Sequence, residues 1–330
     1  MNGMNVSITK KWLSAVLVLM LALLAACGGG NAGKGGESGN VSPTATVEPT
    51  SEAQATAEPV YPLTVTDATG TQITFEQAPQ SIVTLVPSET ETIFAIGAGH
   101  LVVGVDEHSN YPEEAASIAK VGDMATNIEA VAALNPDLVL ASSSMNGDAV
   151  AKLRELNLNV YATAPKTYDE VIAKIVEIGK IVNMPAEASE VADRMRQVKQ
   201  QVEDAVKDAE KRKVYLEFSE GWTVGSGEFM DELLTIAGGI NVAGGQSGWF
   251  EVNAEEIVQQ NPQVIIYPDY GEEKSSIVAA IEKRPGWETI DAVKNGRLVK
   301  VTNDPLVRVG PRLADGLLEM AKAVHPELFE

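Results

Sequence analysis

The chain has 330 residues, of which 45% are hydrophobic and only 5% aromatic, and its formal net charge at pH 7 is −21. This acidic balance disfavours nucleic acid and anionic lipid as direct partners, because both would be repelled. The single cysteine, Cys27, excludes an intramolecular disulfide and a cysteine-based metal cluster.

The first 26 residues have the pattern of a secretory signal peptide. Lys10 and Lys11 precede an apolar run over residues 12–26, which is short for a membrane-spanning helix. The run ends in Leu-Leu-Ala-Ala-Cys-Gly, which resembles the bacterial lipobox, so cleavage would leave Cys27 as a lipidated, palmitate-bearing N-terminus. A buried free cysteine fits less well, because small residues precede Cys27 and three glycines follow it. Removing the signal peptide changes the net charge to −23, since it contains two lysines and no acids.

Residues 27–60 are predicted to be a lipidated, flexible tether. Their side chains are mostly Gly, Asn, Ser, Thr, Pro, Ala and Glu, which offer almost no apolar surface to bury. A coil of this length spans roughly 30 Å on average, enough to hold a globular domain clear of a membrane.

The remaining part of the chain, about 270 residues, suits two lobes. Residues 61–80 are predicted to be a β-hairpin lead-in, with a turn at 67–70. An N-terminal lobe (81–166) and a C-terminal lobe (211–330) follow, in which short aliphatic runs alternate with helical patterns, so each lobe should contain a parallel sheet. The strands are expected at 82–85, 102–105, 138–141, 160–162, 213–218, 264–267 and 298–301, and the C-terminal helices near 229–237, 254–259, 275–282 and 311–324.

A helical bridge (167–210) should connect the lobes. Within it, residues 185–209 carry apolar side chains at helical spacing, and Pro185 suits a first helical turn, so we expect one long helix. The fold class is therefore α/β, with two Rossmann-like lobes joined by a long α-helix, and a single stiff connection should allow only small lobe closure.

Two local patterns predict helix ends. Ser88 and Glu91 have the spacing of a capping box at the start of the helix that follows the first strand. Gly238, after Ala237, is expected to terminate a helix.

Aromatic residues cluster after strands of the second lobe. Ligands of open parallel sheets collect at the carboxyl ends of the strands, and Trp222, Trp249, Phe250 and Tyr270 are expected in loops there. Such a set favours a flat ligand, although any one of these side chains could simply cover an edge of the core.

The three histidines give no metal-binding motif, so we predict no bare metal-ion site. His100 and His325 are expected at the surface, whereas His108 directly follows a predicted strand; a solvated loop histidine remains the alternative. No catalytic set is recognisable, because Gly225-Ser226-Gly227 lacks the pattern of a nucleophile elbow. The chain is therefore expected to be a binding protein that needs no cofactor.

About residues 80–330 resemble the iron-siderophore and vitamin B12 family of periplasmic-binding proteins, which have the class III fold. The resemblance lies in residues 83–97, 102–105, 111–112, 121–122, 127–129, 134–139, 253–257 and 261–265. Segments 108–112, 222–227 and 248–250 are most similar to the cobalamin-binding branch. Two departures are His108, where the best-known member has tyrosine, and the region 124–126, where Met124 lies in place of a tryptophan.

The resemblance implies an extracellular substrate-binding lipoprotein of an ABC importer that captures a corrinoid, cobalamin or cobinamide, in the cleft between the lobes. The implied ligand-binding residues are His108, Tyr111, Trp222, Trp249, Phe250, Tyr270, Asp304 and Arg308. No residue is assigned as a metal ligand, but His108 is a candidate axial nitrogen ligand to cobalt or haem iron.

The charge of these loops bears on the ligand. Anionic siderophores call for several basic residues, and only Arg308 and His108 are present, whereas nearly neutral, amide-rich corrinoids are compatible. A ferric hydroxamate siderophore or haem is the alternative ligand, and a lipid-anchored corrinoid-processing enzyme or hydrolase is an alternative of another class.

Glu129 and Glu255 each follow a helix-starting asparagine, in Asn-Ile-Glu and Asn-Ala-Glu. The family resemblance implies that they dock onto the two permease subunits of the importer, which its ATPase drives; favourable helix electrostatics is the simpler explanation of the residue type. We expect a monomer, anchored by lipid on Cys27 at the extracellular face of the cell membrane or, with two membranes, in the periplasm.

Overall fold

The computed structural model describes residues 58–273 and 275–329. The expected signal peptide, Cys27 and nearly all of the tether lie outside the described residues and stay predictions. No helix in the described part of the chain is long and apolar enough to cross a membrane.

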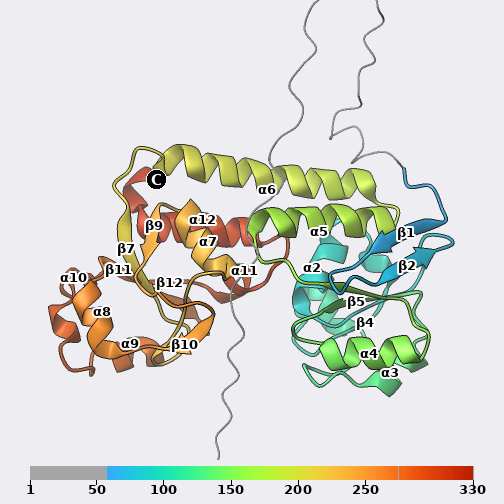
Figure 1. Cartoon of the computed structure of the whole chain (residues 1–330), viewed down its shortest axis with the longest axis horizontal. Coiled ribbons are helices and arrows are strands. Elements are labelled where there is room, and N and C mark those ends of the chain that lie inside the picture. Colours follow the sequence, from blue (N-terminus) through green and yellow to red (C-terminus); the bar gives the residue numbers. More distant parts are fainter. Residues whose placement is uncertain (1–57, 274, 330) are drawn as a thin grey trace, which may run out of the picture. The chain divides into compact units, whose positions relative to one another are not determined.

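The N-terminal lobe is built on a four-stranded parallel sheet in the order β4-β3-β5-β6. Buried aliphatic side chains fill these strands, as expected for a sheet covered on both faces. A separate antiparallel hairpin, β1–β2, precedes it (Figure 1). The elements are β1 (Leu63–Thr66), β2 (Gln72–Phe75), β3 (Ile82–Thr84), α2 (Pro87–Ala95), β4 (Val102–Val105), α3 (Ile128–Ala133), β5 (Leu138–Ser142), α4 (Gly147–Glu155) and β6 (Val160–Thr163), with short 3-10 helices at Gly99–Leu101 and Glu113–Ser117.

The C-terminal lobe repeats this arrangement with a parallel sheet in the order β12-β11-β7-β9. A second antiparallel pair, β8–β10, stands apart from that sheet. The elements are β7 (Arg212–Leu216), β8 (Trp222–Val224), α7 (Phe229–Ile236), β9 (Gly239–Asn241), β10 (Trp249–Glu251), α8 (Ala254–Gln260), β11 (Val264–Asp269), α9 (Ser276–Ile281), α10 (Asp291–Lys294), β12 (Leu298–Thr302), α11 (Asn303–Val307) and α12 (Leu313–Val324), with short 3-10 helices at Trp287–Thr289 and Pro326–Leu328.

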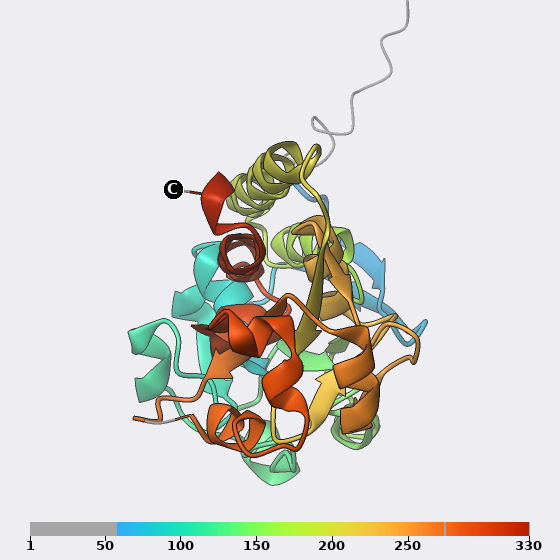
Figure 2. The same cartoon turned by 90° about the vertical axis from the view of Figure 1, so that its left-hand side faces the viewer.

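Two helices connect the lobes, α5 (Tyr168–Ile181) and the long α6 (Pro185–Val206). α6 packs against α5 and against α12, and Figure 2 shows α12 between α6 and the C-terminal sheet. Gly179 permits the close approach of α5 and α6, because a Cβ there would lie 2.2 Å from the Cβ of Ala188. The predicted fold class, two parallel-sheet lobes joined by one long helix, is confirmed.

The strands lie where the sequence predicts them, within a few residues at their ends. The helix C-terminus at Gly238 is also confirmed, since this glycine has a φ of 77° directly after the last turn of α7. The long helix begins at Pro185 and ends at Val206, three residues before the expected end.

The capping box at Ser88 and Glu91 is wrong. The residue before the helix is Val86, which has no capping side chain, and Pro87 occupies the first helical position. Glu91 instead turns inward, where it is buried against two arginines of the other lobe.

Three further expectations are corrected. His325 is buried, with 1% of its surface exposed, because the chain after α12 folds back so that its Nε2 lies 3.4 Å from the carbonyl oxygen of Gly238. Trp222, Trp249 and Phe250 lie on the paired strands β8 and β10 rather than in loops. The segment from Asp304 to Arg308, expected to be a loop, is mostly the helix α11.

Candidate functional site

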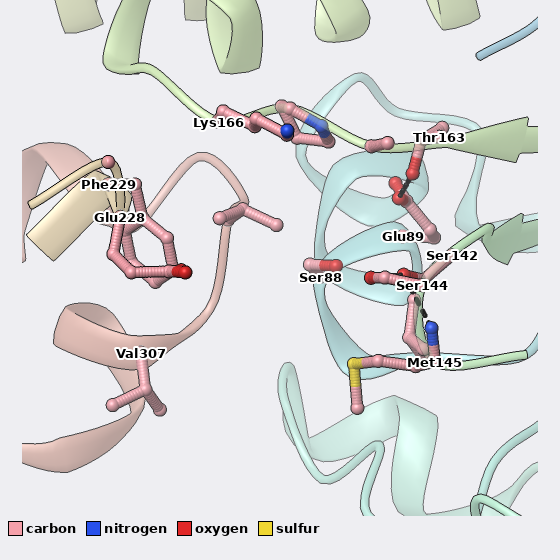
Figure 3. A pocket seen from close by; sticks show the side chains of 15 residues that line it. Ser88, Glu89, Ser142, Ser144, Met145, Thr163, Lys166, Glu228, Phe229 and Val307 are labelled. Atoms are coloured by element: carbon pink, nitrogen blue, oxygen red, sulfur yellow. Dashed lines mark hydrogen bonds between the residues drawn. The ribbon is translucent and has the colours of Figure 1, made fainter. Parts of the chain in front are cut away.

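A cavity of about 330 Å³ lies between the two lobes, at the carboxyl ends of strands (Figure 3). The wall from the N-terminal lobe consists of residues that end β5 and β6 or follow β3, β5 and β6. The facing wall consists of residues that follow β8 and residues of α11 and its end. Its polar and aromatic lining comprises Ser88, Glu89, Ser142, Ser144, Thr163, Lys166, Glu228 and Phe229, and its apolar lining includes Met145, Val307 and Val309. This is the position in which open parallel sheets bind ligands.

The aromatic residues of the second lobe form a cluster, which we call the aromatic wall: Trp222, Trp249, Phe218 and Tyr270. In the β8–β10 register Trp222 pairs with Glu251 and Trp249 with Val224, so both tryptophans project from the same face of the pair. Each tryptophan is 45% exposed.

Contacts within the aromatic wall position the ring of Trp249. Trp249 meets Phe218 edge to face, with centroids 5.0 Å apart. The hydroxyl of Tyr270 donates to the carbonyl oxygen of Phe218 at 2.6 Å, and burial together with nearby Glu272 raises the pKa of that phenol. Phe218, which accepts this hydrogen bond, therefore supports the half-exposed ring of Trp249.

Phe250 lies apart from the aromatic wall. It is paired with Thr223, on the opposite face of the β8–β10 pair from the tryptophans, and lines a separate cavity beside α8 with Val242 and Ile257. The structure therefore does not bring Phe250 together with Trp222 and Trp249.

Arg308 and Asp304 lie in a network of ion pairs that joins the lobes. Arg308 donates to Glu91 (2.8 Å) and pairs with Asp304 (2.9 Å), and it also donates to the Asn110 side chain (3.0 Å). Only 12% of the Arg308 side chain is exposed. Its donors are thus committed to protein groups, and Glu91 is the carboxylate at the centre.

Arg312 is the second cation of this network. Its Nε and Nη2 donate to the two carboxylate oxygens of Glu91, at 2.9 and 2.6 Å. Burial would lower the pKa of Arg312, but the hydrogen bonds to Glu91 and the attraction of Glu91 and Asp304 hold it above the ordinary value. Its guanidinium also stacks on the ring of Tyr111, 4.0 Å from the centroid.

His108 lies in the loop after β4, in an exposed position. Its backbone N–H donates to Asp106 (3.0 Å), and its carbonyl oxygen accepts from Arg308 of the other lobe (3.3 Å). The imidazole has no hydrogen-bond partner among the described residues. One network, which is distinct from the aromatic wall, thus brings together His108, Tyr111, Asp304 and Arg308.

A second buried ion pair joins the lobes beside the cavity. Lys174 of α5 donates to Glu89 (2.9 Å) and to the carbonyl oxygen of Val309 (2.7 Å). The other oxygen of Glu89 accepts from Thr163 at 2.5 Å. Both charged side chains are at least 95% buried, so Lys174 balances the charge of Glu89 although Glu89 lines the cavity.

Glu129 and Glu255 are exposed in the first turns of α3 and α8. Asn127 and Asn253 cap these helices as predicted, each accepting a backbone N–H at 3.0 Å. No group of three or more His, Cys, Asp and Glu side chains that could hold a metal ion is found within residues 58–273 and 275–329.

Sequence reasoning missed the cavity lining at Ser142, Met145, Lys166, Glu228 and Phe229. The strand-end rule alone could have found the first three, because they follow the predicted strands at 138–141 and 160–162. It also missed Glu91, whose partners are more than 200 residues away along the chain.

Comparison with known proteins gives consistent similarities. A family described as periplasmic binding protein matches residues 82–305. The uncharacterized ABC transporter substrate-binding lipoprotein YvrC of Bacillus subtilis is 35% identical over 82% of this chain and 88% of its own length. A cobalamin-binding protein of Halobacterium salinarum is 30% identical, covering 80% of this chain and 74% of its own. The crystal structure of the vitamin B12-binding protein of Vibrio cholerae superposes with a TM-score of 0.67 and 26% identity, over 75% of this chain and 97% of that chain.

Proposed function

Because the chain belongs to the family of periplasmic binding proteins, we propose that it captures a corrinoid between its lobes and delivers it to an ABC importer. This family consists of the binding components of transporters, not of enzymes. The family resemblance predicted from the sequence is confirmed.

The observation that carries the corrinoid proposal is the aromatic wall. Trp222 and Trp249 present flat, half-exposed rings on one face of the β8–β10 pair. A large apolar surface left open to water costs free energy, about 25 cal/mol per Å², so a planar ligand that covers both rings is the natural occupant. The similarity to cobalamin- and B12-binding proteins supports the same ligand class.

The ion pairs around Arg308 support a ligand whose macrocycle is nearly neutral. Arg308, the main cation expected to face a ligand, is paired with Glu91 and Asp304. A catecholate or citrate siderophore would have to displace these carboxylates, whereas the amides of a corrinoid need only hydrogen-bond donors and acceptors. His108 would meet the ligand through its free imidazole, as a hydrogen-bond donor to an amide or as an axial nitrogen ligand.

An absorbance titration with cobalamin, cobinamide, haem and a ferric hydroxamate tests this proposal, with mass spectrometry of the ligand recovered from the complex. We expect saturable, equimolar binding of a corrinoid and its recovery unchanged. Binding of haem or the hydroxamate alone would reject the corrinoid, and a chemically altered corrinoid would indicate a processing enzyme.

We further propose that Glu129 and Glu255 dock the protein onto the two permease subunits. Both carboxylates are exposed, one on each lobe, in the same capped-helix setting. A contact with two related subunits calls for such a matched pair, and exposed charges of this kind set encounter and register.

The same proposal places the protein outside the cell membrane, anchored by lipid on Cys27. YvrC, which covers most of this chain, is named a lipoprotein, and this supports the anchor. A shift of the protein from the membrane fraction to the medium on Cys27→Ala would test it.

A further inference from the structure

Ser88 is a largely buried residue whose hydroxyl lies at the wall of the interlobe cavity. The residue is 94% buried, since only 6% of its surface is exposed. Its carbonyl oxygen accepts from Thr92 at 2.7 Å, but its hydroxyl has no hydrogen-bond partner among the described residues. Figure 3 shows the side chain projecting from α2 into the cavity. A hydroxyl that faces a cavity and has no protein partner can donate to a ligand or to water.

The surroundings of Ser88 favour a negatively charged group. Ser88 stands in the first turn of the nine-residue helix α2, whose N-terminal end carries a partial positive charge. The hydroxyls of Ser142 and Ser144, 3.0 Å from each other, line the same wall. Lys166 extends along the upper edge of the cavity in Figure 3, and its ammonium forms no ion pair with a described residue.

Two acidic residues, Glu89 and Glu228, also line this cavity. The negative charge of Glu89 is balanced by its ion pair with Lys174, and its other carboxylate oxygen accepts a hydrogen bond from Thr163. Glu228 lies across the cavity on the other lobe, beside Phe229 (Figure 3). There it can accept a hydrogen bond from a hydroxyl or amide N–H on the far side of the same ligand group.

Resting on the proposed function, we propose that this cavity is a subsite for an oxyanion carried on an arm of the bound macrocycle, held by Ser88, Ser142, Ser144 and Lys166. At about 330 Å³ the cavity is at the lower limit of drug-sized ligand pockets, which are roughly 300–1,000 Å³, so it accommodates an appended group but not a whole corrin. In cobalamin that oxyanion is the phosphodiester of the nucleotide loop, and in haem it is a propionate.

Cobinamide, which has the corrin ring but lacks the phosphate, the ribose and the base, is the discriminating probe. The wild-type chain should bind cobalamin more tightly than cobinamide, and cobinamide phosphate should recover much of the difference. Ser88→Ala should weaken cobalamin binding about tenfold, in line with the loss of a hydrogen bond to a charged group, and leave cobinamide binding unchanged. Lys166→Gln should weaken cobalamin binding by up to about fivefold, as expected for an exposed charge.

Matched controls separate the subsite from general effects. Ser117→Ala removes an exposed hydroxyl on the 3-10 helix after β4, and Lys152→Gln removes an exposed charge on α4; neither residue lines the cavity. Both control variants should bind cobalamin and cobinamide like the wild type. Ser88 makes no side-chain cap or other side-chain hydrogen bond in the described structure, so Ser88→Ala should unfold at the wild-type temperature.

The outcomes distinguish this inference from the proposed function. Tight binding of both corrinoids with an unchanged cobalamin-to-cobinamide ratio in Ser88→Ala overturns the subsite and leaves corrinoid capture intact. If no corrinoid binds, the proposed function fails, and haem against its dimethyl ester becomes the test. If the wild-type chain binds haem more tightly than haem dimethyl ester and Ser88→Ala abolishes this preference, the oxyanion subsite is supported. If the chain distinguishes neither cobalamin from cobinamide nor haem from its dimethyl ester, the subsite is overturned.

Discussion

Replacing Glu91 with glutamine should uncouple the two lobes. Glu91 Oε1 accepts from Arg308 and Arg312 at 2.8 and 2.6 Å, and Oε2 accepts from Arg312 at 2.9 Å. The carboxylate is 1% exposed, and the guanidinium-bearing side chains are 12% and 18% exposed. Glutamine keeps the shape of the side chain but leaves two nearly buried cations with Asp304 as their only carboxylate partner in the described network.

The expected loss in the free energy of unfolding follows from this geometry. Breaking a buried ion pair by removing one partner costs about 3–5 kcal/mol. We expect about 3 kcal/mol, because both arginines retain some exposure and Arg308 keeps Asp304 at 2.9 Å. With a urea slope of about 3 kcal/mol per molar, the unfolding midpoint should fall by about 1 M.

Urea unfolding followed by circular dichroism and by tryptophan fluorescence is the assay for Glu91→Gln. Glu113→Gln is the control, because Glu113 is exposed and forms no ion pair with a described residue. A midpoint for Glu91→Gln that stays within the range of this control would refute the argument that Glu91 holds the lobes together.

Three further changes have defined outcomes. Trp222→Ala and Trp249→Ala should each weaken corrinoid binding about three- to tenfold in fluorescence-quenching titrations, since aromatic stacking contributes about 0.5–1.5 kcal/mol beyond area burial; unchanged affinity in both variants would remove them from the site. Reversing Glu129 and Glu255 to lysine together should abolish uptake by cells that carry the cognate importer but not ligand affinity, and wild-type transport would leave them as helix-end charges only. Asp67→Asn should lower the free energy of unfolding at pH 7, because hydrogen bonds outweigh burial and hold the pKa of this carboxyl below its usual value. Such a carboxylate stabilises the fold above its unfolded-state pKa and ceases to do so as the pH falls through the lower folded-state value, so the difference from wild type should shrink below about pH 4; a constant difference would contradict this.

The sequence predicted the fold well because the patterns that indicate its strands and helices depend on residues that are close together in the chain. Buried aliphatic strands, the glycine after α7 and the long periodic helix α6 each depend on neighbours in the chain. The short strand β9 was missed because Gly239–Asn241 has no apolar run, and it pairs with β7 only once α7 has turned the chain back. His325 was placed at the surface because nothing local indicates that its ring packs near Gly238.

The candidate site was predicted in part for the same reason. The exposed tryptophans could be recognised from their type and position, although not their pairing into β8–β10. Arg308 was expected to face the ligand, but its acceptors in Glu91 and Asn110 come from the other lobe and could not be seen in the sequence. The partnerless hydroxyl of Ser88 is likewise a tertiary property, since its pattern with Glu91 resembles an ordinary capping box.

Equilibrium dialysis of the purified chain against labelled cobalamin, with unlabelled cobinamide and haem as competitors, tests corrinoid capture most directly. We expect one bound cobalamin per chain, displaced by excess cobinamide but not by equimolar haem. Absence of saturable cobalamin binding, or its full displacement by equimolar haem, would contradict the account.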